Sequence, residues 1–362
     1  MKGHPFERIE RIPQTCIWEI TGACNLRCVH CENHCGKRSP RELDYDAMVR
    51  IAQSLARLGC RLVDVTGGEP LMLPRWDELC GVITGLGMKA ALITNGTLLD
   101  QEALDRAQKA GVGVIGVSID GLREVHDATR LRPKPRPGPT PWDDAVEGMK
   151  RALGRAPDID TVVITQVNCH NLPQLPALRS FLGELGVRRW QLQLCVPTGR
   201  VLELDVPYVI RPEDLEDLTA TIVNAAADGK EPFIDTSDTI GYYTDREPIL
   251  RKRTTGQGLW IGCQAGIRSV AITYDGTVRG CSAMPAEFDA GDLHEESIEE
   301  IWKDGERFAY STRFDPLELS GACGQCRFGA LCRAGCTSMA YWVTGTIYEN
   351  PYCLHRLREI AK

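Results

Sequence analysis

The sequence lacks the features that would place a protein on a membrane or on nucleic acid. It contains no uninterrupted apolar run long enough to span a bilayer, and its N-terminus, MKGHPFERIERIPQTC, has no apolar signal-peptide core. Excess positive charge is also missing, since 42 Lys and Arg stand against 49 Asp and Glu, and residues 251–253 are the one basic run of note. We therefore expect a cytoplasmic protein with neither nucleic acid nor a membrane as partner.

Cysteine, by contrast, is abundant, and its distribution is uneven. In a reducing compartment the 16 cysteines are poor disulfide candidates and good metal ligands. Cys24, Cys28 and Cys31 form a C-x3-C-x2-C pattern within eight residues, and seven more cysteines lie in the last hundred residues. Cys60 and Cys80 lie among apolar residues, and we interpret them as small core side chains.

Between the two groups of cysteines, candidate strands alternate with candidate helices. Apolar, β-branched stretches predict six strands, at 16–21, 61–66, 89–94, 112–119, 161–167 and 189–196. The segments between them show helical periodicity, and Asp100 is predicted to cap one of these helices. This alternation favours an α/β fold, a partial (β/α)6 TIM-like barrel with its active site at the C-terminal strand ends.

Polar or glycine-rich residues come directly after each predicted strand in the sequence. These strand exits are 21–24, 67–70, 94–96, 118–121, 168–171 and 197–200. Any one of them could be an ordinary turn, because Gly, Asn, Asp and Pro are common turn residues. Six of them in register favour a shared site at one mouth of the barrel.

Three thiolates from one loop suit two kinds of metal centre. A tetrahedral zinc site needs a fourth ligand, which His30 or His34 could supply. A 4Fe-4S cube held by three cysteines instead leaves one iron to an exogenous ligand.

Together with Gly67-Gly68-Glu69-Pro70, the C-x3-C-x2-C loop resembles the signature of the radical SAM superfamily. The resemblance implies that the three cysteines hold a 4Fe-4S cluster whose fourth iron is chelated by S-adenosylmethionine. The glycines and Glu69 would receive the methionine amino group, and Ser118 and Arg130 would contact the carboxylate and its surroundings. The full set of implied S-adenosylmethionine contacts is Gly67, Gly68, Glu69, Asn95, Ser118, Arg130 and Asn168.

The C-terminal cysteines resemble a second pattern, the seven-cysteine SPASM domain with two auxiliary 4Fe-4S clusters. The resemblance assigns one set to auxiliary cluster II: Cys323, Cys326, Cys332 and Cys353. It assigns Cys263, Cys281 and Cys336 to auxiliary cluster I, so we predict an open or non-cysteine coordination site there. A zinc ribbon built from Cys323, Cys326, Cys332 and Cys336 is the alternative. The run SVAITYDGTVRG predicts a β-hairpin that turns at Asp275-Gly276.

These assignments predict four parts of the chain. They are an N-terminal extension (1–14), a radical SAM partial barrel (15–230), a bridging region (231–262) and a SPASM domain (263–362). The resemblance implies S-adenosylmethionine and three 4Fe-4S clusters as cofactors, and a 5′-deoxyadenosyl radical that abstracts a hydrogen atom from the substrate.

The favoured substrate is a ribosomally synthesised precursor peptide whose side chains are crosslinked or oxidised. Few residues precede the first strand, so we expect no N-terminal leader-recognition domain. A separate leader-recognition protein, or the proline-rich stretch 131–142, would have to replace it. A flavodoxin- or ferredoxin-type reductant is expected to supply the electron.

Several alternatives stay open from the sequence. A peptide epimerase would use a thiol such as Cys195 to return a hydrogen atom, and Asp120 is a second catalytic candidate, although either could be structural. A sulfatase-type formylglycine maturase is disfavoured because Ser282, not an aspartate, follows Cys281. A small-molecule enzyme could act on a tetrapyrrole or a sugar. An iron-sulfur electron carrier or a zinc-stabilised binding module would explain the cysteines but not residues 67–70 or the six polar strand exits.

Overall fold

A ten-stranded sheet forms the centre of the computed structural model, which describes residues 10–134, 137–251 and 258–360. All six predicted strands are present, parallel and adjacent in chain order, so the predicted fold class is confirmed. They are β1 (Thr15–Glu19), β3 (Leu62–Thr66), β4 (Lys89–Thr94), β5 (Val114–Ser118), β7 (Asp160–Val167) and β8 (Arg189–Leu194). The predicted N-terminal extension, the basic run 251–253 and the proline-rich stretch 131–142 lie partly outside the described residues.

Further strands extend this sheet at both edges. β9 (Phe233–Thr236), from the predicted bridging region, pairs in parallel with β8, and β10 (Ser269–Ile272) pairs in parallel with β1. β10 and β11 (Thr277–Arg279) form the predicted antiparallel hairpin, and β12 (Gly291–Asp292) pairs with β11. The C-terminal cysteine-rich part is therefore built onto the same sheet as the loop that follows β1. We call this loop, residues 20–36, the cluster loop.

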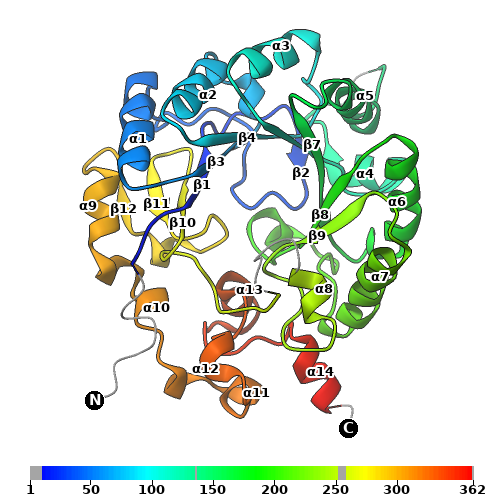
Figure 1. Cartoon of the computed structure of the whole chain (residues 1–362), viewed down its shortest axis with the longest axis vertical. Coiled ribbons are helices and arrows are strands. Elements are labelled where there is room, and N and C mark those ends of the chain that lie inside the picture. The colour runs from blue at the N-terminus through cyan, green and yellow to red at the C-terminus, as the bar shows by residue number, and fades with distance from the viewer. Residues whose placement is uncertain (1–9, 135–136, 252–257, 361–362) are drawn as a thin grey trace.

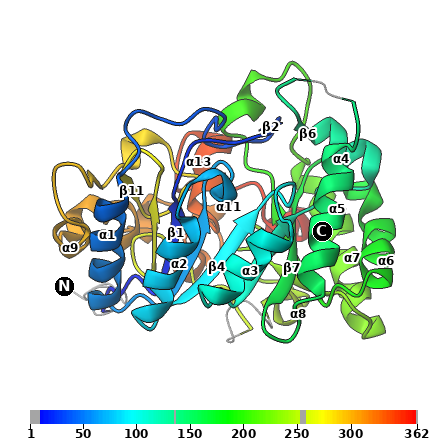
Figure 2. The same cartoon turned by 90° about the horizontal axis from the view of Figure 1, so that it is seen from above.

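Helices surround the curved sheet on its outer side (Figures 1 and 2). Along the barrel they are α1 (Tyr45–Arg57), α2 (Trp76–Gly85), α3 (Gln101–Lys109), α4 (Arg123–Thr129), α5 (Pro141–Leu153), α6 (Leu175–Glu184) and α7 (Leu215–Asp228). Asp100 caps α3 as predicted, since its Oδ1 accepts a hydrogen bond from the Ala103 amide at 2.8 Å. A short two-stranded sheet, β2 (Arg27–Cys28) with β6 (Arg130–Leu131), joins the cluster loop to the end of α4.

The rest of the chain forms short helices, and all of them except α9 lie in the lower half of Figure 1. They are α8 (Glu247–Arg251), α9 (Ile298–Lys303), α10 (Ala309–Thr312), α11 (Gly321–Gly324), α12 (Gly329–Cys332), α13 (Thr337–Thr344) and α14 (Leu354–Ile360). Among the described residues, none of the helices combines the length and apolarity that crossing a membrane requires.

The two faces of the sheet differ in chemistry because side chains alternate along each strand. Residues that face the helices are fully buried in the main hydrophobic core, among them Trp18, Val63, Leu92, Ile115, Val163 and Trp190. Residues of the opposite parity line the inner face of the barrel, and many are half-buried or polar: Glu19, Asp64, Ser118, Gln166, Gln191 and Gln193. The inner face is thus the surface on which a polar ligand can be held.

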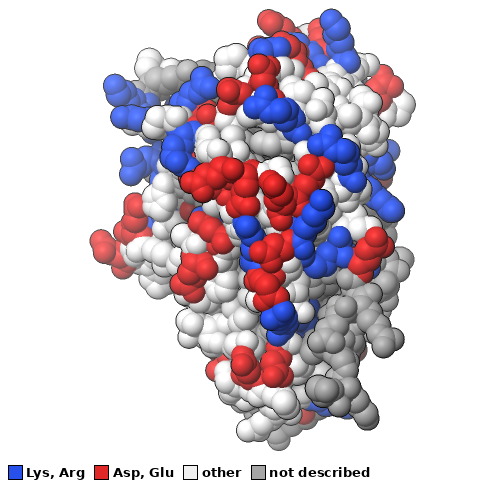
Figure 3. Space-filling model, turned by 90° about the vertical axis from the view of Figure 1, so that its left-hand side faces the viewer, with Lys and Arg blue, Asp and Glu red and all other residues white. Residues whose placement is uncertain are grey.

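Acidic and basic side chains are interspersed on the face that carries α1 and α9 (Figure 3). Arg57 of α1, for example, pairs with Glu299 of α9 at 2.8 Å. Such pairing gives this face a mixed charge, in agreement with the expectation from the net charge.

Candidate active site

Two glycines after β3 hold the first half of the cluster loop by close backbone contact. The Gly68 amide donates to the Thr21 carbonyl at 2.7 Å, and the Glu69 amide donates to the Ala23 carbonyl at 2.8 Å. A Cβ on Gly67 would lie 2.4 Å from the Thr21 oxygen, and one on Gly68 would lie 2.2 Å from the Ala23 oxygen. Only glycine permits this approach, so these residues position the cluster loop in addition to any ligand contact.

Gly199 and Arg200, after β8, hold the second half of the loop. A Cβ on Gly199 would lie 2.3 Å from the Cys31 carbonyl oxygen, and the Arg200 amide donates to that oxygen at 3.1 Å. The buried Arg200 guanidinium donates to the carbonyls of Cys28, at 3.2 Å, and Cys35. The sequence identified this strand exit as polar, but it did not indicate that Arg200 fixes the cluster loop.

The thiols of the cluster loop are flanked by nitrogen donors. Asn95 Nδ2 lies 3.9 Å from Cys24 Sγ, and Arg130 Nη1 lies 3.9 Å from Cys28 Sγ. Burial raises the pKa of Cys24 to about 12 and that of Cys28 to about 11, whereas a hydrogen bond from Cys35 lowers the pKa of Cys31 to about 6. A bound cationic centre replaces such protons, and the donors stabilise the resulting thiolates. This donor set fits an iron-sulfur cluster held by three cysteines.

Glu69 is buried, and its carboxylate links β3 to the exit of β4. It accepts hydrogen bonds from Thr94 Oγ1 at 2.7 Å, the Asn95 amide at 2.8 Å and the Leu71 amide at 3.2 Å. Burial raises its pKa to about 7. These contacts position Asn95 beside Cys24, while the predicted contact of Glu69 with a methionine amino group stays a prediction.

Asp120 and Arg130 form a buried ion pair behind the cluster loop. Arg130 Nε donates to Asp120 Oδ2 at 2.7 Å, His30 Nε2 lies 3.4 Å from the same oxygen, and the Gln166 amide donates to Oδ1 at 2.9 Å. Burial opposes ionisation of Asp120, but Arg130 and His30 outweigh it and lower the pKa of this carboxyl. Asp120 thus positions Arg130 against Cys28, and its predicted catalytic role stays a prediction.

The other predicted S-adenosylmethionine contacts lie at neighbouring strand ends. Ser118 ends β5 on the inner face. Asn168 is fully buried and is held by its own turn: its Oδ1 accepts from the His170 amide at 2.9 Å, and its Nδ2 donates to Tyr208 Oη at 3.1 Å. These bonds explain the burial of Asn168 without a ligand.

Cys195, the other catalytic candidate, follows β8 and is fully buried. It packs with Val201 and Tyr208 in a small hydrophobic cluster beside the cluster loop. Burial raises its pKa well above the ordinary value. These contacts agree with the structural interpretation of Cys195, and its role as a hydrogen-atom donor stays a prediction.

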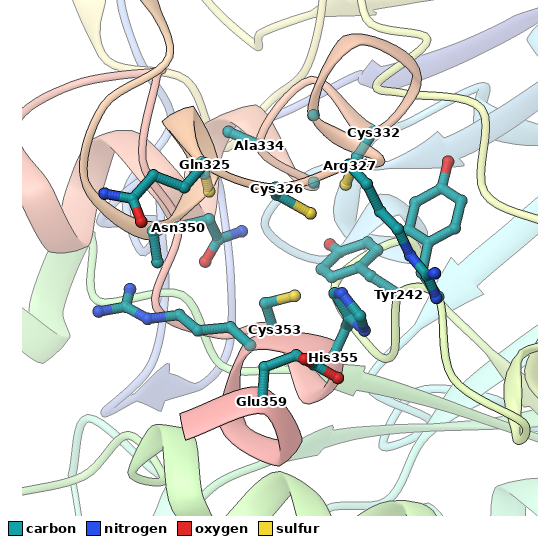
Figure 4. Close-up of a pocket in the computed structure, with 16 residues that line it drawn as sticks. Tyr242, Gln325, Cys326, Arg327, Cys332, Ala334, Asn350, Cys353, His355 and Glu359 are labelled. Carbon is teal, nitrogen blue, oxygen red and sulfur yellow. The ribbon is translucent and has the colours of Figure 1, made fainter. Parts of the chain in front are cut away.

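The four cysteines assigned to auxiliary cluster II line one cavity of about 550 Å³ (Figure 4). Cys323 and Cys326 come from α11 and the turn after it, Cys332 ends α12, and Cys353 precedes α14. Cys326, Cys332 and Cys353 point into the space between these helices, and Tyr242, Asn350 and His355 complete the wall. Four thiols converging on a cavity of this size fit a 4Fe-4S cluster.

The three cysteines assigned to auxiliary cluster I also lie near one another. Burial, followed by the nearby thiols of Cys336 and Cys263, raises the pKa of Cys281. Cys336 Sγ lies 3.3 Å from Ser338 Oγ, and its backbone amide donates to Tyr242 Oη at 2.9 Å. Cys336 therefore joins the two auxiliary sites through Tyr242.

Among the residues that the structure describes, no three Cys, His, Asp or Glu side chains are gathered closely enough to hold a single metal ion. Zinc requires its sulfur ligands at about 2.3 Å from one ion, whereas a four-iron cube accepts thiolates at separate corners. The zinc alternatives for residues 24–31 and for the C-terminal cysteines stay predictions.

Comparisons with known proteins agree with this geometry. Residues 18–174 match the family model of the radical SAM superfamily, and residues 263–327 match the SPASM iron-sulfur cluster-binding domain. An AdoMet-dependent heme synthase of Methanosarcina barkeri (strain Fusaro / DSM 804) is 31% identical over 359 residues, which cover 95% of this chain and 97% of that protein. The chain belongs to the radical SAM superfamily. It is a radical SAM enzyme with a SPASM domain, and its cofactors are S-adenosylmethionine and 4Fe-4S clusters.

Two further proteins are similar to this radical SAM enzyme. The mycofactocin maturase MftC of Mycobacterium tuberculosis (strain ATCC 25618 / H37Rv) is 29% identical over 351 residues, covering 96% of this chain and 83% of that protein. The crystal structure of Streptococcus suis SuiB bound to the precursor peptide SuiA has a TM-score of 0.72 at 16% identity, covering 95% of this chain and 76% of that chain. At that identity the likeness to SuiB shows the fold alone.

Proposed function

We propose that this radical SAM enzyme oxidises side chains of a ribosomally synthesised precursor peptide. The observation that carries the proposal is the parallel pairing of β10 with β1, in which Thr15 lies opposite Ser269 and Trp18 opposite Ile272. This pairing attaches the cysteine-rich part to the strand that leads into the cluster loop. One sheet would thus support both the proposed site of hydrogen abstraction and the proposed site of an electron acceptor.

The turn between β10 and β11 contacts the cluster loop directly. The ring of Tyr274 packs against Gly22, where a Cβ would lie 3.0 Å from it, and Tyr274 Oη donates to the Asn33 carbonyl at 3.4 Å. When bound, the cofactors supply a 5′-deoxyadenosyl radical at the cluster loop and electron acceptance at the auxiliary sites. An oxidised substrate would lose one hydrogen atom to the adenosyl group, then one electron and one proton.

Peptide modification is supported by the relation to MftC and by the fold shared with peptide-bound SuiB. A precursor peptide, a flavodoxin- or ferredoxin-type reductant and a separate leader-recognition protein are the proposed partners. Oxidation by auxiliary clusters is favoured over epimerisation because Cys195 is packed among apolar side chains.

A second candidate is oxidation of a tetrapyrrole, favoured by the 31% identity to a heme synthase across 97% of that protein. The two candidates are separated by offering the anaerobically reconstituted enzyme a synthetic peptide library and, in parallel, a carboxylate-bearing iron porphyrin. The proposal predicts peptides that lose two hydrogen atoms in step with 5′-deoxyadenosine release. Conversion of the porphyrin with unchanged peptides would favour the second candidate.

A further inference from the structure

We propose that Glu19 anchors a cationic group of the substrate, an ammonium or a guanidinium, on the inner face of the barrel. The inference rests on the proposed function and narrows its substrate class to peptides with a basic side chain or free amine near the modified residue. It is carried by the position of Glu19, by a buried carboxylate oxygen that no side chain pairs with, and by the charges around it.

Glu19 is the last residue of β1, and it points to the side of the sheet opposite Trp18, which is buried in the outer core. Its side chain is only 6% exposed. Oε1 accepts a hydrogen bond from Asn33 Nδ2, the Tyr274 backbone amide also stabilises the carboxylate, and Oε2 is buried without a side-chain partner among the described residues. A buried carboxylate oxygen without a full set of donors costs free energy, which a ligand that donates to it recovers.

Glu19 also lies between the cluster loop and the β10–β11 hairpin. Its hydrogen-bond donor, Asn33, follows Cys31 by two residues in the cluster loop, and the Asn33 carbonyl accepts from Tyr274 in the β10–β11 turn. That hairpin leads to Cys281, one of the cysteines assigned to auxiliary cluster I. A group bound at Glu19 would therefore hold the substrate between the cluster loop and the auxiliary site.

The charges of the inner face favour a cation over an anion. Asp64 lies on the same face in register with Ile17, and Gln166 Oε1 is a second buried acceptor that has no partner among the described residues. The guanidiniums beside the cluster loop are already engaged, since Arg130 pairs with Asp120 and Arg200 donates to backbone carbonyls. Burial, and next the nearby Glu32, raise the pKa of Glu19 to about 8, and a cation bound beside the carboxylate would lower it.

The test compares peptides of one length that carry lysine, norleucine or glutamate at a single position. Dissociation constants are measured by calorimetry on the reconstituted full chain with S-adenosylmethionine. Wild type is expected to bind the lysine peptide about 10- to 100-fold more tightly than the norleucine peptide, the range of a charge-assisted hydrogen bond. Glu19→Gln should reduce this ratio of dissociation constants to about one. Because both peptides are measured on the same variant, a partly folded sample affects both constants alike and leaves the ratio unchanged.

The matched control is Glu203→Gln, which removes an exposed carboxylate that pairs with His34 at 2.8 Å. It should keep the wild-type ratio. Equal binding of the lysine and norleucine peptides to wild type, or an undiminished ratio in Glu19→Gln, would overturn the role of Glu19 while leaving peptide modification in place.

A second measurement separates this inference from the proposed function. n-Butylammonium is expected to raise the melting temperature of wild type more than n-butanol does, and Glu19→Gln should lose the difference. Suppose n-butylammonium raises the melting temperature in a way that depends on Glu19, while peptides stay unmodified. Cation binding by Glu19 would then be supported, and peptide oxidation would be contradicted. If peptides of every charge are modified equally, and butylammonium raises the melting temperature of Glu19→Gln as much as that of wild type, cation binding by Glu19 is contradicted while peptide oxidation is kept.

Discussion

Replacing Gly68 with alanine tests whether backbone contact positions the cluster loop. The new Cβ would lie 2.2 Å from the Ala23 carbonyl oxygen and 2.6 Å from its carbon, so the two backbones must separate by about 1 Å. Separation weakens two hydrogen bonds, worth about 1 kcal/mol each, and adds about 1–3 kcal/mol of overpacking. The loop should therefore lose about 3–5 kcal/mol of its stabilisation in the native position.

Gly68→Ala should reduce the rate of S-adenosylmethionine cleavage more than it reduces the stability of the fold. A 1 Å misplacement of reacting groups can cost on the order of 100-fold in rate. We expect Gly68→Ala to release 5′-deoxyadenosine at least 100-fold more slowly and to bind S-adenosylmethionine more weakly, measured by anaerobic turnover and calorimetry. Gly36→Ala is the matched control, because it lies in the same loop and its Cβ would meet nothing within 4 Å. Equal rates for the two variants would refute the reasoning.

Three further changes test other parts of the site. Arg130→Gln leaves the buried Asp120 carboxylate without its guanidinium partner, although His30 still lies 3.4 Å away, and should lower the unfolding free energy by about 3–5 kcal/mol in urea. Adding Asp120→Asn should recover at least half of this loss, and a double variant as unstable as the single would contradict the pairing. Burial raises the pKa of Asp64 to about 6, so its contribution to stability falls as pH rises from about 3 to about 7, by about 3 kcal/mol in all. Asp64→Asn should lose this pH-dependent change, and parallel curves of unfolding free energy against pH for both proteins would count against it. Cys353→Ala should lower reconstituted iron from about twelve to about eight per chain while S-adenosylmethionine is still cleaved, and unchanged iron would exclude Cys353 as a ligand.

The regular part of the fold was predictable because its signals are local. Each inner strand is an apolar, β-branched run, and the hairpin at Asp275-Gly276 is marked by alternation and a turn pair. The resemblance to the SPASM pattern likewise anticipated the convergence of Cys323, Cys326, Cys332 and Cys353 on one cavity. Spacing constrains which thiols can meet, and the fold then brings them together.

Contacts between distant loops were not predictable. Arg200 reaches Cys28 across 172 positions, and nothing in its local sequence distinguishes it from a turn residue. The role of Asp120 depends on Arg130, ten residues later, which the sequence could pair with S-adenosylmethionine as readily as with a carboxylate. The parallel pairing of β10 with β1 joins the two ends of the chain, and single-strand patterns carry no information about such partners.

The central claim is that residues 24–31 hold the cluster that cleaves S-adenosylmethionine, while the C-terminal cysteines hold two others. The most direct measurement is iron per chain and 5′-deoxyadenosine after anaerobic reconstitution, in wild type and in the Cys24→Ala/Cys28→Ala/Cys31→Ala variant. We expect about twelve irons with cleavage in wild type, and about eight irons without cleavage in the variant. Cleavage that persists in the variant, or about four irons in wild type, would contradict it.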